Sequence, residues 1–329
     1  MSAVIVILLP VITFMSVVPW GGCLVRRLRA WHIGKNIRDD EPGSHEVKQG
    51  TPTMGGILFL LPLVAWLLVL LIGGNTSVWP VLLATIGFGC LGAYDDISGL
   101  RDETGVGWKA RTKFPCQLMV GLLVAVGAYW SLGRGSVYIP GTSLRWELGF
   151  WYLPLATVVV AGWANAVNLS DGLDGLAGGM MVVALAAYGI ITYSMGLAVE
   201  ASICSVLGGA LLAFLWYNGY PAQVFMGDVG SLALGAALAA IALMSEQWLL
   251  LPLVGIVFVV ETLSVIIQVA YFKYTRRKYG TGRRIFRMSP LHYHFELGGW
   301  SEVQVTQRFV SVAVMVALCG TALALGFPR

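Results

Sequence analysis

The sequence predicts an all-α integral membrane protein of about ten transmembrane helices, and three observations support that fold class. Of the 329 residues, 57% are apolar and 12% are charged, and the mean hydropathy is +0.77. Soluble domains usually carry roughly 25% charged residues, so the composition excludes a soluble protein. Apolar runs long enough to cross the hydrocarbon layer as helices, about 20 residues each, recur along the chain between short polar segments.

The apolar runs define the candidate spans. A transmembrane barrel would need segments of about ten residues with alternating polarity, whereas the run from Leu249 to Ala270 is much longer and mostly apolar. We therefore expect helices in one membrane domain, residues 1–329, with no separate soluble domain. The spans begin near Ala3, Met54, Val78, Phe114, Trp151, Leu176, Ala201, Val229, Leu249 and Val303.

The basic residues predict the orientation. No basic residue precedes the apolar core of the first run, so we interpret it as a retained helix with its N-terminus outside. Threading ten helices from that start places both termini outside and the loops near residues 26–53, 95–113, 168–175, 217–228 and 272–302 in the cytoplasm. All 21 basic residues except Arg134, Arg145 and Arg329 then lie on the cytoplasmic side, as the positive-inside rule requires.

Two other classes of function find little support. Insertion and attraction to anionic lipid headgroups explain the basic loops, so we expect no nucleic-acid partner. The five cysteines lack the spacing of a metal site. His292 and His294 could coordinate zinc, but no cysteine or third histidine is near them in the sequence. The remaining histidines, His32 and His45, also fall in cytoplasmic loops.

Acidic residues gather at the predicted cytoplasmic level. Asp95 and Asp96 close the third run, Asp171 and Asp174 lie between the fifth and sixth, and Asp228 precedes the eighth. Acidic groups beside apolar spans are costly and are usually functional. Helix N-termini attract phosphate, but phosphate beside five carboxylates needs a cation. The cluster therefore predicts Mg²⁺ held by oxygen ligands.

Structural explanations compete with these assignments. Asp171 and Asp174 could cap a helix, although the segment ANAVNLSDGLDGLAGG that contains them favours a closely approached ligand. The pair Asp95 and Asp96 could start a solvated loop, and Asp228 could be an N-cap or a metal ligand. Glu261, halfway along the ninth run, could equally face a polar cavity or hold helices together.

Five stretches, in order, resemble the cytoplasmic motifs of the MraY transferases: KQGTPTMGG, GAYDD, NAVNLSDGLDGLAGG, NGYPAQVFMGDVGS and SPLHYHFE. They span Lys48 to Glu296. The resemblance implies a Mg²⁺-dependent phosphoglycosyl transferase of the bacterial inner (plasma) membrane, working as a homodimer. Its implied substrates are UDP-N-acetylmuramoyl-pentapeptide and undecaprenyl phosphate, and its implied products are lipid I and UMP.

The resemblance also implies the site residues. Asp95, Asp96 and Asp228 correspond to the essential carboxylates, with Asp228 at the metal. In the family the last loop usually has three consecutive histidines, whereas Tyr293 is the middle residue here, which puts that contact in doubt. The implied substrate contacts are Lys48, Thr53, Lys113, Asn168, Asp171, Asp174, Asn218, Phe225, Gly227, Ser231, Gln268, His292 and His294.

Two alternative functions remain at this stage. One is a sister transferase that uses UDP-GlcNAc, although TPTMGG and PLHYHFE resemble the muramoyl branch. The other is a secondary transporter, which would need inverted repeats and a binding site at the bilayer midplane. The mechanism also has two forms, direct attack by the lipid phosphate or a phospho-aspartate on Asp95.

Overall fold

The computed structural model describes residues 1–31, 34, 48–101, 107–133 and 135–326, and it is almost wholly helical. His32 and His45 lie outside the described residues. Within these ranges, nine helices are long and apolar enough to cross a membrane, which confirms a helical membrane protein with one long span fewer than the ten predicted. They are α1 (Ala3–Ala30), α3 (Trp79–Arg101), α4 (Ala110–Leu132), α5 (Tyr152–Ser170), α6 (Leu176–Ser194), α7 (Ala198–Asn218), α8 (Gly227–Met244), α10 (Ile256–Tyr279) and α12 (Glu302–Leu325).

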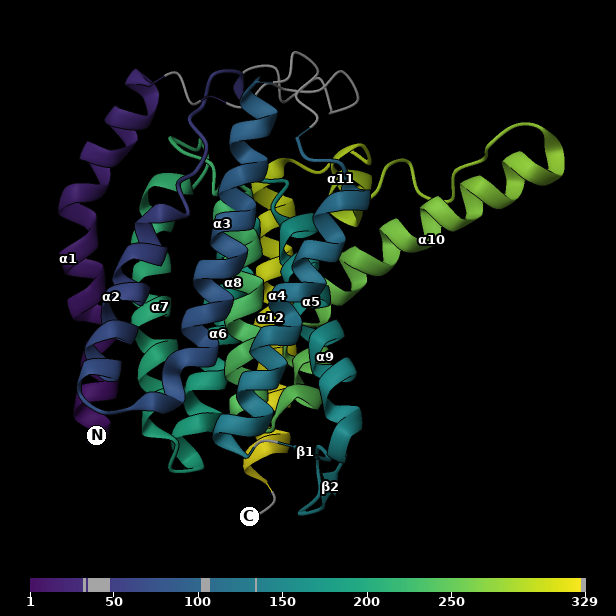
Figure 1. Cartoon of the computed structure of the whole chain (residues 1–329). Helices are drawn as coiled ribbons and strands as arrows, with labels where there is room; N and C mark the ends of the chain where they lie inside the picture. The colour runs from purple at the N-terminus through teal and green to yellow at the C-terminus, as the bar shows by residue number, and fades with distance from the viewer. Residues whose placement is uncertain (32–33, 35–47, 102–106, 134, 327–329) are drawn as a thin grey trace.

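The second predicted span is a shorter helix. It is α2, Ile57–Ile72, with 16 residues, which at 1.5 Å per residue is about 24 Å long. In Figure 1, α1 begins and α12 ends at the same end of the bundle. The short helices are α9 (Leu251–Val254), α11 (Leu291–Glu296), η2 (Thr76–Val78), η3 (Gly149–Trp151) and η4 (Trp248–Leu250).

Helix α8 is the centre of the bundle. Nearly all of its side chains are buried, and its sequence GDVGSLALGAALAAIALM is rich in small residues. Lipid tails give no hydrophobic drive for helix association, so membrane helices depend on close packing. Small side chains permit that close packing. Methyl groups at Gly92 of α3 and Gly56 would lie 2.1 Å from the Asp228 carbonyl oxygen and 2.2 Å from the Gly230 Cα, respectively. The N-terminus of α8 is therefore fixed by backbone contacts.

The ninth apolar run is broken. Helix α9 ends at Val254, and α10 starts at Ile256 and leaves the bundle sideways (Figure 1). Between them lies Gly255, where a methyl group would be 2.4 Å from the ring of Trp163 on α5. Any larger residue at this position would force the Trp163 ring or the helices to shift. The contact with Trp163 therefore explains why glycine occupies the break.

A small hairpin that was not predicted lies at the end of the bundle near both termini (Figure 1). Strands β1 (Ser136–Tyr138) and β2 (Arg145–Glu147) pair antiparallel, with Val137 opposite Trp146. Arg145 Nη2 donates to Glu246 Oε1 at 2.8 Å and ties the hairpin to the segment after α8. At three residues each, these strands are too short for a periodic pattern to predict.

Candidate active site

Five polar side chains meet where α3, α4, α5 and α8 come together. The lysine Lys113, in the first turn of α4, lies between two carboxylates. Its Nζ donates to Asp95 Oδ2 at 2.7 Å and also to Asp228 Oδ2. The side chains of Lys113, Asp95 and Asp228 are 13%, 14% and 27% exposed, so the cluster is mostly buried and still reachable from solvent.

Two neutral side chains orient Asp228. Asn168, near the end of α5, donates through Nδ2 to Asp228 Oδ1 at 2.8 Å and to Ser231 Oγ at 2.9 Å. Ser231 in turn donates to the Gly227 carbonyl at 3.0 Å. Both oxygens of Asp228 are thus engaged, one by an amide and one by Lys113.

Asp96 points away from this cation. Its Oδ1 and Oδ2 accept the backbone N–H groups of Asp228 and Val229, each at 3.0 Å. These groups belong to the first turn of α8, whose N-cap, Met226, makes no side-chain cap bond. Asp96 therefore caps α8 from another helix, and the possibility that Asp228 is itself the N-cap is wrong. The adjacent Asp95 accepts the Trp108 N–H through Oδ1 at 2.5 Å.

The donor set at this cluster suits Mg²⁺. Asp95 and Asp228 both present a carboxylate oxygen to one cation, which here is the Lys113 ammonium group. No group of three or more His, Cys, Asp or Glu side chains that could hold a metal occurs among the described residues. Mg²⁺ needs no such cage, because it is usually bound by one or two carboxylates together with water and substrate phosphates.

A second charged cluster joins three segments. Lys48 Nζ donates to Asp174 Oδ1 at 2.7 Å and to Glu302 Oε1 at 2.5 Å. The Asp174 N–H also donates to Glu302 Oε1, and Asp174 Oδ2 accepts the Ala222 N–H at 2.9 Å. Burial would lower the pKa of Lys48, but the hydrogen bonds and negative charges of Asp174 and Glu302 outweigh it, so its pKa is raised.

Two further residues that were predicted to contact substrate, Asn218 and Asp171, lie at the α5–α6 turn. Asn218 Oδ1 accepts the Gly175 N–H at 3.0 Å, and its Nδ2 donates to the Val224 carbonyl. Gly175, with φ +73°, is the N-cap of α6, so neither aspartate of the turn is that cap. Asp171 is the C-cap residue of α5.

The loop before α8 pairs with the loop before α2. The N–H of Phe225 donates to the Pro52 carbonyl at 2.8 Å, and the Phe225 carbonyl accepts the Gly55 N–H at 2.8 Å. Thr53 is buried and lies against Gly227, where φ is +73° and a methyl group would be 2.8 Å from the Thr53 hydroxyl. Thr53, Phe225 and Gly227 thus lie beside the aspartate cluster.

The residues predicted in the last loop hold that loop in place. Gln268 Oε1 accepts the N–H groups of Ile285 and Phe286, and its Nε2 donates to the Phe286 carbonyl at 3.0 Å. His294 Nδ1 accepts the Arg287 N–H at 3.1 Å. His292 is fully buried and contacts Glu261. None of these contacts tests the substrate roles predicted for Gln268, His292 and His294, so those roles stay predictions.

Sequence reasoning missed Glu302, which bonds Lys48 and the α5–α6 turn. An acidic residue in the first turn of a helix is ordinary, and Ser301 with Gln304 forms a capping box there. No sequence signal therefore distinguished Glu302 from a normal helix start.

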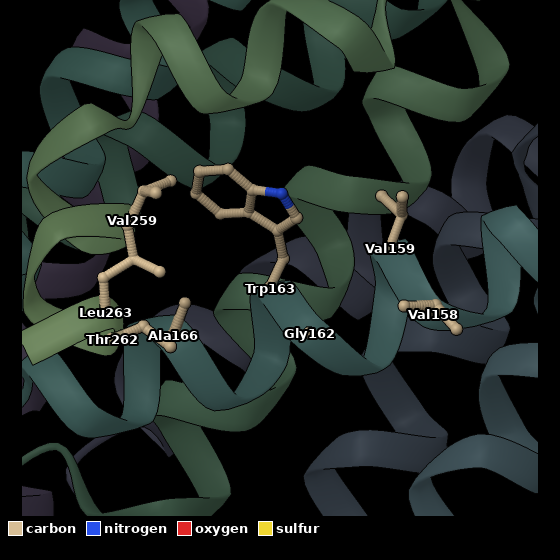
Figure 2. Close-up of a pocket in the computed structure, with 8 residues that line it drawn as sticks. All are labelled: Val158, Val159, Gly162, Trp163, Ala166, Val259, Thr262 and Leu263. Atoms are coloured by element: carbon tan, nitrogen blue, oxygen red, sulfur yellow. The ribbon is translucent and has the colours of Figure 1, made fainter. Parts of the chain in front are cut away.

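An apolar groove lies between α5 and α10, outside the charged clusters (Figure 2). It has a volume of about 210 Å³. In Figure 2 the side chains of the two helices meet around Trp163. Ala166 at the groove is only two residues from Asn168, which bonds Asp228. The lining residues are Val158, Val159, Gly162, Trp163, Ala166, Val259, Thr262 and Leu263.

Comparisons with known proteins give consistent matches. A model of glycosyl transferase family 4 matches residues 78–246, and phospho-N-acetylmuramoyl-pentapeptide-transferase signature 1 matches residues 48–60. The chain is 47% identical to the phospho-N-acetylmuramoyl-pentapeptide-transferase of Chloroflexus aurantiacus, with 98% of this chain and 90% of that protein covered. It is 44% identical to the enzyme of the same name from Heliobacterium modesticaldum, with 93% of each covered.

Proposed function

The chain belongs to the family of phospho-N-acetylmuramoyl-pentapeptide transferases, and on that premise we propose how its own residues carry the reaction. It transfers phospho-N-acetylmuramoyl-pentapeptide from the uridine diphosphate donor to undecaprenyl phosphate, which gives lipid I and UMP. The observation that supports our assignment of the reacting centre is the Asp95–Lys113–Asp228 cluster. A transporter or a UDP-GlcNAc enzyme has no comparable support from the relatives.

Catalysis rests on charge and position. The reaction exchanges one phosphoanhydride for another, so the barrier is lowered mainly by holding the two phosphates in line and neutralising their charge. Lys113 lies between Asp95 and Asp228, and we propose that its ammonium group turns to the donor's diphosphate when that group arrives. Asn168 keeps Asp228 oriented during the exchange.

Direct attack by the lipid phosphate is the mechanism we favour. A phosphate monoester has a second pKa of about 6, so near neutrality it needs no strong base. Asp95 would orient it and accept any remaining proton. Asp95 Oδ1 accepts the Trp108 N–H, and Oδ2 is released to take that proton when Lys113 turns to the diphosphate. If Asp95 were the nucleophile, labelled UMP would exchange into the donor without lipid phosphate.

Asp96 takes a supporting part in this proposal. Because its oxygens bind the backbone at Asp228 and Val229, we assign it to positioning Asp228 and not to contact with substrate. The backbone at this point also approaches Gly92 closely. A shift of Asp96 would therefore move Asp228 relative to Lys113.

We propose that Asp228, together with Asp95, holds Mg²⁺ in the working enzyme. When bound, the ion supplies charge neutralisation for the diphosphate and for the departing UMP. The observation in favour is the pair of carboxylate oxygens directed at one cation. Retention of activity after chelation of all divalent metal would contradict it.

The groove between α5 and α10 is our candidate for the polyprenyl chain. Its lining is apolar apart from Thr262, and Val158 and Leu263 in it are exposed, as a lipid substrate requires. Its end at Ala166 is close in sequence to Asn168, so a lipid lying in it would bring its phosphate toward Asp228. The length of the undecaprenyl chain exceeds the groove, and the remainder would stay in the bilayer.

We propose that the charged clusters face the cytoplasm, that both termini lie outside, and that the enzyme works as a homodimer in the inner membrane. Seven basic residues and no acidic one occur from Lys273 to Arg287, at the end of α10 and in the loop after it. This stretch supports the orientation. An even number of passes, with α2 as a span, is supported by the common end at which α1 begins and α12 ends (Figure 1).

The test is a UMP-release assay. Purified protein is given undecaprenyl phosphate, Mg²⁺ and either UDP-N-acetylmuramoyl-pentapeptide or UDP-GlcNAc, with Asp228→Asn in parallel. We expect release with the muramoyl donor alone, and none from the variant, whose melting transition shows that it is still folded. Release with UDP-GlcNAc alone would move the protein to the sister branch, and release with neither donor would overturn the function.

A further inference from the structure

Glu261 and His292 form a fully buried pair between α10 and α11. The backbone N–H of His292 donates to Glu261 Oε1 at 3.1 Å, and its ring Nδ1 lies 3.2 Å from Glu261 Oε2. Both side chains are 0% exposed. With Oε1 accepting the backbone N–H, Oε2 is placed to accept a proton carried on Nδ1. Glu261 therefore favours the tautomer in which Nδ1 carries the ring proton.

The other ring nitrogen, Nε2, could take part in one more hydrogen bond. His292 Nε2 is buried and has no hydrogen-bond partner in the part of the chain that the structure describes. It faces the α5–α6 turn, since a methyl group at Gly172 would lie 2.2 Å from Nε2. Buried polar atoms without a partner are rare and call for an explanation. With the proton on Nδ1, Nε2 is a hydrogen-bond acceptor.

The position of Nε2 relative to the reacting centre limits what it could accept. Gly172 is partly exposed, and it follows Asn168, which bonds Asp228, by four residues, just beyond the end of α5. A donor whose diphosphate lies at Asp228 would place the attached sugar near this turn. A phosphate oxygen carries no proton for the Nε2 lone pair, whereas a sugar hydroxyl can donate to it.

We propose that Glu261 is a positioning residue that fixes the Nδ1–H tautomer of His292, so that Nε2 accepts a hydrogen bond from a hydroxyl group of the donor sugar. The proposal rests on the proposed function for the identity of the donor. It gives Glu261 a task beyond holding two helices together, because the tautomer matters only if Nε2 has a ligand. Fixing a tautomer through the opposite ring nitrogen is an established way to direct a histidine.

Glu261→Gln separates the two roles. The glutamine oxygen can still accept the His292 N–H, while its NH₂ group would donate to Nδ1. The ring proton then moves to Nε2, which changes from acceptor to donor with the packing preserved. We expect an unchanged melting temperature and a loss of about 10- to 100-fold in kcat/KM for the nucleotide-sugar donor. The KM for polyprenyl phosphate should stay the same.

Nitrogen NMR of ¹⁵N-histidine-labelled protein gives a readout independent of turnover. His292 should carry its proton on Nδ1 in the wild type and on Nε2 in Glu261→Gln. Thr192→Val is the matched control, because that buried hydroxyl donates to the Tyr188 and Gly189 carbonyls of its own helix. It should change neither the tautomer nor the kinetics.

Three results would overturn the proposal. They are a wild-type proton on Nε2, a swapped tautomer with full activity, or a Glu261→Gln variant that loses its fold and its activity with both substrates together. A failure of the proposed function is distinguishable, because it appears as an inactive wild type with the muramoyl donor whatever the tautomer.

Discussion

Asp96 lies across the N-terminus of α8 and accepts the backbone N–H of Asp228 at 3.0 Å. Its neighbour Asp95 instead meets the cation Lys113. Two adjacent carboxylates of one helix therefore have different partners, one the backbone and the other an ammonium group. The difference follows from the 100° turn per helical residue, which points the two side chains in different directions from α3.

We predict that Asp96→Asn loses both stability and activity. Asparagine offers one acceptor oxygen where Asp96 uses two, and it removes a negative charge from a helix N-terminus. Loss of such a cap costs about 1–2 kcal/mol, and displacement of Asp228 should lower kcat. Melting temperature in detergent and UMP release measure the two effects.

Asp95→Asn is the matched control for Asp96→Asn. Asp95 accepts from Lys113 and from the Trp108 N–H, so its variant should lose activity while the backbone amides of Asp228 and Val229 keep the hydrogen-exchange protection that Asp96→Asn removes. Loss of that protection in both variants alike, or in neither, would contradict the assignment of Asp96 to the backbone.

A second prediction concerns Lys113. Lys113→Met leaves Asp95 and Asp228 facing each other without their shared cation, so the variant should melt at a lower temperature in EDTA than the wild type. Added Mg²⁺ should restore stability, since a ligand at 100 times its dissociation constant adds about 2.7 kcal/mol. We expect a larger Mg²⁺-induced rise in melting temperature for Lys113→Met than for the wild type.

Lys109→Met controls for the loss of a positive charge near the same site. Lys109 is exposed and immediately precedes α4, so its replacement should leave the response to Mg²⁺ unchanged. If Mg²⁺ stabilises Lys113→Met no more than Lys109→Met, Asp95 and Asp228 do not form a metal site.

Much of the fold could be predicted because a bilayer permits few structures. Backbone groups in lipid must be paired within the segment, so long apolar runs become helices. The sixth run was predicted to begin at Leu176, and α6 begins there. The break at Gly255 had no sequence signal, because it depends on Trp163 of another helix.

The candidate site was predictable only in part. The sequence indicated that the aspartates lie at one level, but it could not show which lysine each would meet. That pairing is set by helix packing: Asp95 and Asp228 share Lys113, whereas Asp174 meets Lys48. Glu302 was not predicted for a related reason: its partner, Lys48, is far away in the sequence.

The Lys48–Asp174–Glu302 cluster predicts a large effect on stability. Glu302→Ala would leave the Asp174 N–H without its acceptor and would break a mostly buried ion pair. Breaking such a pair costs about 3–5 kcal/mol. Chemical denaturation of both proteins in the same detergent measures the difference.

Glu147→Ala is the control for Glu302→Ala. The Glu147 side chain is 69% exposed and lies 3.5 Å from Arg145 Nε, so its removal should cost between 0 and about 1 kcal/mol. Similar losses for the two variants would mean that the Lys48 cluster behaves as a surface ion pair.

The groove between α5 and α10 gives a prediction that separates the two substrates. Gly162 lines the groove, and no atom of the described residues lies within 4 Å of where its side chain would begin. Gly162→Leu should therefore fold normally and fill part of the groove. We expect the KM for undecaprenyl phosphate to rise about 10-fold, on the scale of a few lost apolar contacts. The KM for the nucleotide donor should not change.

The control for Gly162→Leu is the same substitution at Gly208 of α7, which also has open space around it but lies outside the groove lining. A lipid phosphate with a chain too short to fill the groove gives a second comparison, because it should be used equally by the wild type and Gly162→Leu. If Gly162→Leu impairs both lipids alike, the added side chain acts on the site itself. An unchanged KM for the long lipid would instead place its chain elsewhere on the bundle.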